Sequence, residues 1–438
     1  MERKIILIKV RNKTLFTVFN PIIVEPLELE YLRSICNSKG LNSYIKDDIF
    51  DDNENTPIKD GDIFVLTGYN VSENQILIEA EAIKNQYPSS IVIVGGVHIE
   101  NNSSFFHRDF VDCVIHSHDL RVFERILDLI INEGEYFEES PLGYDYRNDE
   151  GNWVIGDILI EENYIDILPD RSLLESNIHK TRYLNKNSVG LVKGSISCPF
   201  NCSFCYCREI NQGKYLKADY SKLVREIKAV PTDYVWIVDD VLFSNRNDAL
   251  EFIDEMKKVK PNKKIIIYLR ADFIIKEEEI LKDLIDQGLD EVIIGFEAVT
   301  KGELKSYNKG TNPVDYPEVI NILNRLSLDY SGLFMVHPDY GIKDFLNLLG
   351  FIKRNKIDIY TISIFTPLKG TRDFEAFKDQ LTKTNPKYFD FLHLVIKSKL
   401  PKPVFYIFFM IIHLRLLRSK RVWAFIKNNT LGKRNGNS

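Results

Sequence analysis

The chain has 438 residues, 44% of them hydrophobic and 27% charged, which is an ordinary globular composition long enough for two domains. Its formal net charge of −6 argues against general nucleic-acid binding, which needs a basic surface. Three of the six cysteines gather in one short segment, which does not resemble a disulfide framework, so we expect a reducing cytoplasm. We expect no signal peptide and no membrane span, because the chain shows neither a signal-peptide core nor a run of about 20 apolar residues.

The first 135 residues alternate short apolar runs with segments of helical spacing. Strands are predicted at 4–10, 62–67, 91–94 and 111–115, and helices at 27–38, 74–86 and 120–131. Continuous apolar strands separated by helices are typical of a parallel sheet that is covered on both faces. The sequence therefore predicts a doubly wound α/β domain over residues 1–135, whose ligands bind beyond the carboxyl ends of the strands.

A glycine-rich corner, Gly95-Gly96-Val97-His98, follows one of these predicted strands. Glycine there lets the backbone approach a large ligand closely, although a tight turn also uses glycine for steric reasons alone. His98 is a candidate cofactor contact, and a structural or solvent-facing histidine is the alternative. No GxGxxG segment follows the first strand, so we do not expect a dinucleotide site.

Residues 136–188 are rich in turns and charges and are interpreted as a linker. A second series of strands and helices occupies residues 189–380, with strands predicted at 189–197, 234–238, 264–269, 291–294, 332–336 and 357–365. Six strand–helix units at this spacing predict a partial (β/α)6 barrel of the TIM type. Its active site would lie at the carboxyl ends of the strands.

The segment Cys198-Pro-Phe-Asn-Cys202-Ser-Phe-Cys205 follows the first predicted barrel strand. Three thiolates at this spacing can hold three irons of a cubane cluster and leave the fourth iron open for chemistry, whereas electron-transfer clusters usually have four thiolates. A zinc site is the alternative, but it would need a fourth ligand at short spacing. Cys207 follows too closely for a second CxxC pair, and His179 lies upstream across an uncertain loop.

Residues 381–438 are predicted to form a helical extension of the barrel. Within them, Val404–Leu417 is strongly apolar, is interrupted by His413 and Arg415, and is followed by further basic residues. A helix packed on the barrel is the favoured interpretation. The alternative is an interfacial helix that contacts a membrane peripherally through residues 404–421.

The chain resembles the radical SAM enzymes that carry an N-terminal cobalamin-binding domain, often called class B radical SAM methylases. The resemblance runs over nearly the whole length. It is carried by the CxxxCxxC triplet and by motifs at 26–32, 93–98, 165–170, 238–240, 269–272, 294–298, 309–310 and 366–371, and the segments 389–393 and 400–406 are similar to hopanoid-methylase relatives.

The resemblance implies a flavodoxin-like, B12-binding first domain and roles for particular residues. Cys198, Cys202 and Cys205 would hold a [4Fe-4S] cluster that binds and reductively cleaves S-adenosylmethionine (SAM) to a 5′-deoxyadenosyl radical. The implied cofactor-binding residues, for SAM and for cobalamin, are Phe204, Asp239, Asp240, Arg270, Glu297, Gly95, Gly96 and His98. Each has an ordinary alternative: Phe204 lining its loop, the two aspartates capping the next helix, and Arg270 pairing with Glu297.

The sequence departs from the family pattern mainly around the cobalamin site. No Asp-x-His-x-x-Gly segment offers a histidine to cobalt, Val97 replaces the proline of the glycine turn, and His116-Ser117-His118-Asp119 replaces a Gly-Glu-Gly-Glu segment. Pro338-Asp339-Tyr340-Gly341 likewise departs from Pro-Gly-Glu-Thr. Two interpretations of the first domain stay open: it binds cobalamin, or it is a docking surface that has lost the site.

The resemblance implies a cobalamin-dependent methyltransferase that acts on an unactivated carbon. Cyclisation, coupling or dehydrogenation without methyl transfer is one alternative, and a non-catalytic iron–sulfur sensor is another. The expected partners are a small-molecule, lipid or peptide substrate and an electron donor such as flavodoxin or ferredoxin, with no nucleic acid. The expected location is the cytoplasm, with membrane association as an option.

Overall fold

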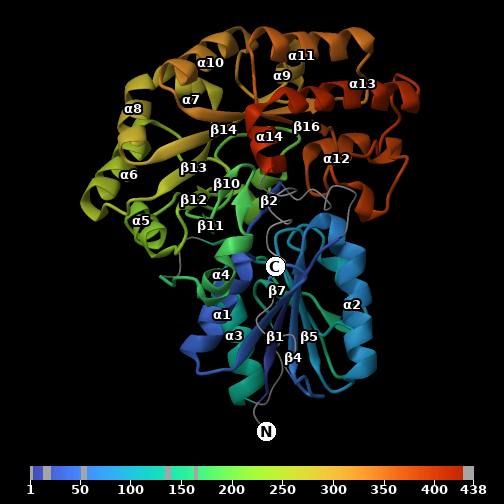
Figure 1. The fold of residues 1–438 in the computed structure, drawn as a ribbon. Coiled ribbons are helices and arrows are strands. Elements are labelled where there is room, and N and C mark those ends of the chain that lie inside the picture. The colour runs from blue at the N-terminus through green and yellow to red at the C-terminus, as the bar shows by residue number, and fades with distance from the viewer. Residues whose placement is uncertain (1–2, 13–20, 51–56, 134–139, 162–165, 428–438) are drawn as a thin grey trace, which may run out of the picture.

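The computed structural model describes residues 3–12, 21–50, 57–133, 140–161 and 166–427, and it consists of two α/β units (Figure 1). Ile165, at the start of one family motif, and residues 428–438 of the predicted extension lie outside the described residues. Among the described residues, no helix is both long enough and apolar enough to cross a membrane. All six cysteines are free thiols.

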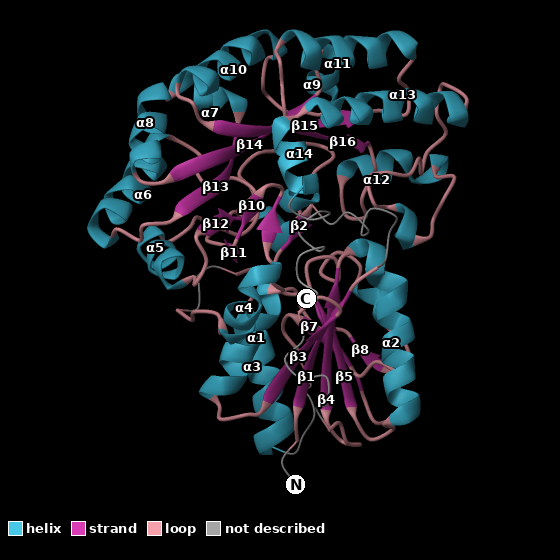
Figure 2. Ribbon diagram, viewed as in Figure 1, coloured by secondary structure: helices cyan, strands magenta, loops and turns pink. Residues whose placement is uncertain are grey.

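The first unit is a sheet whose five parallel strands follow the order β3-β1-β4-β5-β6. The predicted parallel sheet is thus present, and the order, second-first-third-fourth-fifth along the chain, is one of the two common doubly wound arrangements. Helices α1 and α3 cover one face and α2 covers the other (Figure 2). The elements are β1 Ile5–Val10, α1 Leu27–Ser38, β3 Ser43–Asp47, β4 Ile63–Gly68, α2 Glu73–Gln86, β5 Ile91–Gly95, β6 Cys113–Ile115 and α3 Leu120–Asp128.

Strand β4 explains why these strands have continuous apolar sequences. All six of its residues are buried. Successive side chains point to opposite faces of a strand, so Ile63 and Val65 pack beneath α1 and α3 while Phe64 and Leu66 pack beneath α2. A strand that is buried on both faces needs an apolar residue at every position.

Part of the predicted linker completes the first sheet. Strands β7 (Tyr144–Arg147) and β8 (Trp153–Val154) add to its edge in the antiparallel direction. Asp145 of β7 is buried, and burial alone would raise its pKa. Hydrogen bonds from His116, the Gly156 amide and His107 outweigh burial and lower the pKa of Asp145 to about 2. These hydrogen bonds satisfy the buried carboxylate and hold β7, the strand next to the edge of the sheet, in place.

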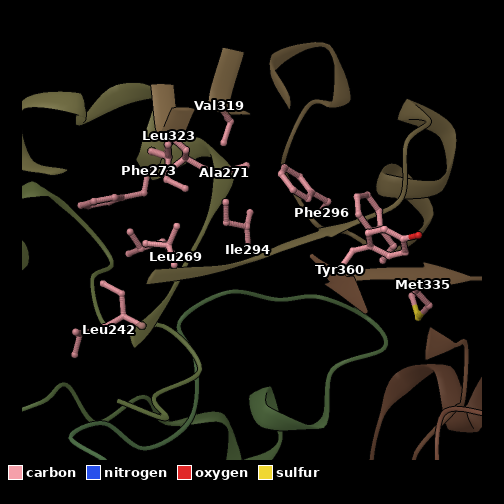
Figure 3. Close-up of a cluster of buried hydrophobic side chains, with 14 of the residues drawn as sticks. Leu242, Leu269, Ala271, Phe273, Ile294, Phe296, Val319, Leu323, Met335 and Tyr360 are labelled. Atoms are coloured by element: carbon pink, nitrogen blue, oxygen red, sulfur yellow. The ribbon is translucent and has the colours of Figure 1, made fainter. Parts of the chain in front are cut away.

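The second unit is the predicted partial barrel, six parallel strands in consecutive order. The strands are β11 Val189–Val192, β12 Tyr234–Ile237, β13 Lys264–Leu269, β14 Leu289–Glu297, β15 Asp329–Val336 and β16 Tyr360–Ile364. Its outer helices are α5 Tyr220–Ala229, α6 Arg246–Val259, α7 Ala271–Lys276, α8 Glu278–Asp286, α9 Lys301–Ser306, α10 Tyr316–Arg325, α11 Ile342–Arg354 and α12 Arg372–Phe377. The main core lies between strands and helices, where Leu269 and Ile294 lie near Phe273 of α7 and Leu323 of α10 (Figure 3).

The extension packs on the barrel through helix α13 (Lys402–Leu414), which is followed by α14 (Lys420–Ile426). Phe405, Phe409 and Ile412 of α13 are buried in the barrel core. The ring of Phe405 lies 5.1 Å from that of Phe345 on α11. The favoured prediction of a packed helix is confirmed for this face of α13.

A buried ionic cluster joins the two units. The Arg171 guanidinium donates to Glu25 at 3.1 Å and Glu30 at 2.9 Å, beside and within α1, and to Glu226 of α5 at 3.0 Å. Burial raises the pKa of Glu30 to about 8 and of Glu226 to about 7, because one cation does not offset the desolvation of three carboxyl groups. Tyr31 donates a further hydrogen bond to Glu226 at 2.8 Å.

Candidate active site

The cysteine loop follows β11 at the carboxyl end of the barrel strands, as predicted. Burial, with a smaller contribution from the nearby Cys205, raises the pKa of Cys198 to about 11 and that of Cys202 above its usual value. A hydrogen bond with Cys207 lowers the pKa of Cys205 and favours the thiolate, which is the metal-binding form. Among the described side chains, no three His, Cys, Asp or Glu residues are placed to share a single metal ion.

The loop is fixed by segments that lie far from it in the sequence. The Ser203 amide donates to the Tyr307 carbonyl at 3.0 Å, and the Ser203 hydroxyl contacts Asp373 at 3.1 Å. The Phe204 ring packs edge-on against Tyr307, with 5.6 Å between ring centroids. Phe204 therefore lines the loop and joins it to the barrel core, and its contact with a cofactor stays a prediction.

The two aspartates after β12 differ in their surroundings. Asp239 is fully buried and accepts a hydrogen bond from the Gly194 amide at 2.7 Å, so it holds the start of the cysteine loop. Burial raises its pKa, although the nearby Lys193 ammonium opposes this. Asp240 is only partly buried and lies close to Cys207. The predicted alternative, that they cap the next helix, is wrong because Asn245 caps α6.

Arg270 and Glu297 do not pair with each other, so the alternative of an Arg270–Glu297 ion pair is wrong. Glu297 accepts from the Lys309 ammonium at 3.0 Å, whereas Arg270 donates to Asp272 at 2.9 Å and to the Lys309 carbonyl at 3.0 Å. The Arg270 guanidinium also lies 3.7 Å from the centroid of the Phe200 ring in the cysteine loop. The cluster thus places two cations, Arg270 and Lys309, near the cysteines, each paired with a carboxylate.

Lys309 is the functional candidate that the sequence analysis missed as a site residue. Its side chain is only 11% exposed, and the carboxylate of Glu297 outweighs burial to raise its pKa. Its charge also partly opposes the rise that burial causes in the pKa of Cys202, so it lies near the thiols. The Lys309-Gly310 motif was visible in the sequence. The sequence does not show that Lys309 pairs with Glu297, so no role could be given to the lysine.

The glycine corner of the first unit faces the cysteine loop. Gly96 has a positive φ of 127°, and a Cβ there would lie 2.5 Å from Thr67 Oγ1, so the steric reason for this glycine is sufficient. The His98 ring lies 5.1 Å from the ring of Tyr206, which follows the last cysteine of the triplet. Burial lowers the pKa of His98 to about 4, so its imidazole is neutral at physiological pH.

A cavity of about 440 Å³, counted with its open mouth, lies between the two units. Most of that volume is open solvent and the enclosed part is about 30 Å³, so the pocket is a shallow cleft between the units. Its polar walls are tied together by hydrogen bonds from Asn70 to the Phe389 carbonyl at 3.0 Å and from Lys369 to Asn102 at 3.3 Å. It is lined by Asn70, Glu73, His98, Asn101, Asn102, Tyr206, Leu368, Lys369, Thr384, Pro386 and Phe389.

Comparison with known proteins places this geometry in context. The hopanoid C-3 methylase of Methylococcus capsulatus is 22% identical over 341 residues, which cover 76% of this chain and 64% of that protein. The bacteriochlorophyllide d C-8(2)-methyltransferase of Chlorobaculum tepidum is 26% identical over 225 residues, covering 48% of this chain and 49% of that enzyme. The chain thus spans about half to two thirds of these relatives.

Two solved structures share the two-unit fold. The radical SAM methyltransferase TsrM from Kitasatospora setae superposes with a TM-score of 0.67 at 11% identity, over 94% of this chain and 89% of that one. The cobalamin-dependent SAM radical enzyme OxsB gives 0.61 at 15% identity, over 81% and 52%. Residues 193–352 match the model of the radical SAM superfamily. Residues 193–352 thus resemble a radical SAM domain, and the chain shares its two-unit fold with these two cobalamin-dependent or radical SAM structures.

Proposed function

We propose that the chain is a cobalamin-dependent radical SAM methyltransferase that acts on an unactivated carbon. The observation that carries the proposal is the cavity between the units, whose wall includes both Tyr206 of the cysteine loop and His98 of the first sheet. Ligands of doubly wound sheets and of barrels bind at the carboxyl ends of the strands. Here these two edges meet, so a cofactor of each unit would lie close to the other.

A radical SAM domain implies a [4Fe-4S] cluster and SAM. Cys198, Cys202 and Cys205 would hold the cluster, and the residues beside them match the ends of SAM in charge. Lys309 and Arg270 suit its carboxylate, while Glu297 suits its amino group. When bound, the cluster supplies the electron that cleaves SAM, and cobalamin supplies the methyl group.

The first unit offers a fit for cobalamin through His98, whose neutral imidazole is a form that binds metals. The histidines that replace the expected acidic segment are already engaged within the chain. His116 contacts Asp145 at 3.1 Å, and His118 pairs with Glu100. His98 is thus the strand-end histidine that faces the cavity, among those described.

Gly295→Ala is expected to weaken SAM binding by about tenfold. A Cβ at Gly295 would lie 2.4 Å from Glu297 Oε1 and 3.0 Å from Lys309 Nζ, so it would displace the ion pair while leaving the barrel intact. Equilibrium dialysis of SAM against the anaerobically reconstituted protein measures the change. Gly302→Ala is the matched control, because a Cβ there meets nothing within 4 Å. Equal affinities for both variants would remove the ion pair from the SAM site.

Anaerobic purification with cobalamin supplied, followed by iron, sulfide and cobalt analysis, tests the proposal. The expected result is about four irons per chain and cobalamin that survives gel filtration. His98→Phe is expected to lose cobalamin and keep iron, whereas His179→Phe, on an exposed residue, keeps both. Full iron without cobalamin in the unchanged protein would replace methyl transfer by cyclisation, coupling or dehydrogenation. Zinc in place of iron would rule out the proposal.

A further inference from the structure

One face of helix α13 carries a stripe of bulky apolar side chains that the structure leaves exposed. Ile407, Met410, Ile411 and Leu414 are spaced i, i+3, i+4 and i+7, so they share one face. They are 57%, 47%, 42% and 56% exposed. We call these four residues the tail stripe. Such a contiguous apolar surface marks an interaction site, whereas single exposed apolar residues need no explanation.

The tail stripe cannot turn inward, because the opposite face of α13 is fixed to the barrel. Phe405, Phe409 and Ile412 on that face are buried. Tyr360 of β16 donates a hydrogen bond to the Ile412 carbonyl at 2.6 Å, which fixes the rotation of the helix about its axis. The exposed face is therefore a permanent feature of the folded barrel.

The charge of the tail contrasts with that of the rest of the chain. Residues 391–438 hold ten of the 57 Lys and Arg residues and none of the 63 Asp and Glu residues, although the whole chain has a net charge of −6. Among the described cations, Arg418 and Lys420 are exposed just beyond α13. Exposed Leu417 and Trp423 continue the apolar surface there. Apolar side chains flanked by cations match the boundary of an anionic bilayer.

We propose that the tail stripe and its flanking cations dock the protein on the surface of an anionic membrane. With 13 residues, α13 is about 20 Å long, so it would lie in the plane of the interface. A second copy of the same face is a poorer occupant. A symmetric dimer would bring the two basic tails together and oppose like charges. The proposal does not depend on which cofactors the protein holds.

Co-sedimentation of the full chain with lipid vesicles tests the proposal. The expected result is binding to vesicles with about 30% phosphatidylserine, weak binding to phosphatidylcholine alone, and loss of binding as salt rises from about 0.1 M to about 1 M. Trp423 supplies a second readout, because its exposed indole should shift its emission to shorter wavelength on entering the interface.

Substitutions distinguish vesicle binding through the tail stripe from nonspecific adsorption by exposed apolar residues elsewhere. Ile407→Gln with Ile411→Gln is expected to weaken vesicle binding by about tenfold or more. The matched control is Val314→Gln with Leu250→Gln, two exposed apolar positions elsewhere on the barrel, which should bind as the unchanged protein does. Equal loss in both pairs, or no vesicle binding by the unchanged protein, would overturn the proposal.

The cations provide an independent comparison. Arg418→Gln and Lys420→Gln are each expected to weaken binding to phosphatidylserine vesicles by about fivefold. Lys257→Gln and Lys282→Gln, on exposed positions of α6 and α8, should leave it unchanged. A concentration-dependent dimer that the Ile407 and Ile411 changes abolish, without lipid binding, would assign the surface to self-association and overturn the membrane proposal.

Discussion

Replacing any one of Cys198, Cys202 or Cys205 by alanine is expected to lower the iron content from about four per chain to below about one, and to abolish SAM cleavage. Three thiolates would hold three of the four irons, so removing any one of them would leave two irons without a protein ligand. Anaerobic reconstitution, followed by iron and sulfide analysis and by assay for 5′-deoxyadenosine, measures both effects. Circular dichroism of the same samples separates cluster loss from unfolding.

Cys207→Ala is the matched control for these variants. Cys207 lies in the same loop and exchanges a hydrogen bond with Cys205, and its own pKa is raised by that bond and by burial. It falls outside the CxxxCxxC spacing, so the variant should keep its iron. Loss of iron in Cys207→Ala together with full iron in Cys198→Ala would show that a different set of thiols holds the metal.

Arg171→Met is expected to reduce the free energy of unfolding by about 3–5 kcal/mol. The change leaves Glu25, Glu30 and Glu226 buried around an apolar side chain, so their carboxyl groups lose the cation that pairs with all three of them. This ionic cluster lies between α1 of the first unit and α5 of the second. The substitution therefore weakens the contact between the two units. Urea denaturation followed by circular dichroism measures it.

Arg225→Met supplies the comparison for an exposed ion pair. Its partner is Asp166, and the two side chains are 53% and 70% exposed. Surface pairs of this kind contribute about 0–1 kcal/mol, so little change is expected. Adding Glu30→Gln and Glu226→Gln to Arg171→Met should restore part of the stability by removing buried acids. No restoration would mean that packing of the Arg171 stem, rather than its charge, holds the units together.

The two parallel sheets could be predicted from the sequence because their strands are apolar without interruption. Strands such as β4 leave no alternative to burial on both faces. Strand β7, next to the edge of the sheet, could not be predicted in this way, since Asp145 and Arg147 break its apolar pattern. Its position depends on the two histidines that contact Asp145, one of them 38 residues earlier in the chain. Long-range pairing of a buried charge has no local sequence signal.

The site was predictable in its residue types but not in its pairings. The spacing of the cysteines and their place after the first barrel strand follow from the sequence. The choice of Lys309 as the partner of Glu297 does not, because it depends on a bulge in β14 and on a positive φ of 61° at Glu297. At this bulge Glu297 contacts the Lys309 ammonium, and Arg270 contacts Asp272. Gly295 is the one sign of this pairing in the nearby sequence, because any larger residue there would collide with the Glu297–Lys309 ion pair.

The hydrogen bond from Asn70 to Phe389 has a consequence for biosynthesis. The two residues are separated by 319 positions, yet both line the cavity between the units. At roughly 5–20 residues per second on the ribosome, the second wall is made about 15–60 s after the first. The first sheet has time to fold in that interval, but it then offers only an open surface. Any ligand of the cavity must therefore be enclosed late, after residue 389 has left the ribosome. A ligand that binds the first sheet earlier would be held by that sheet alone, without the wall that contains Phe389.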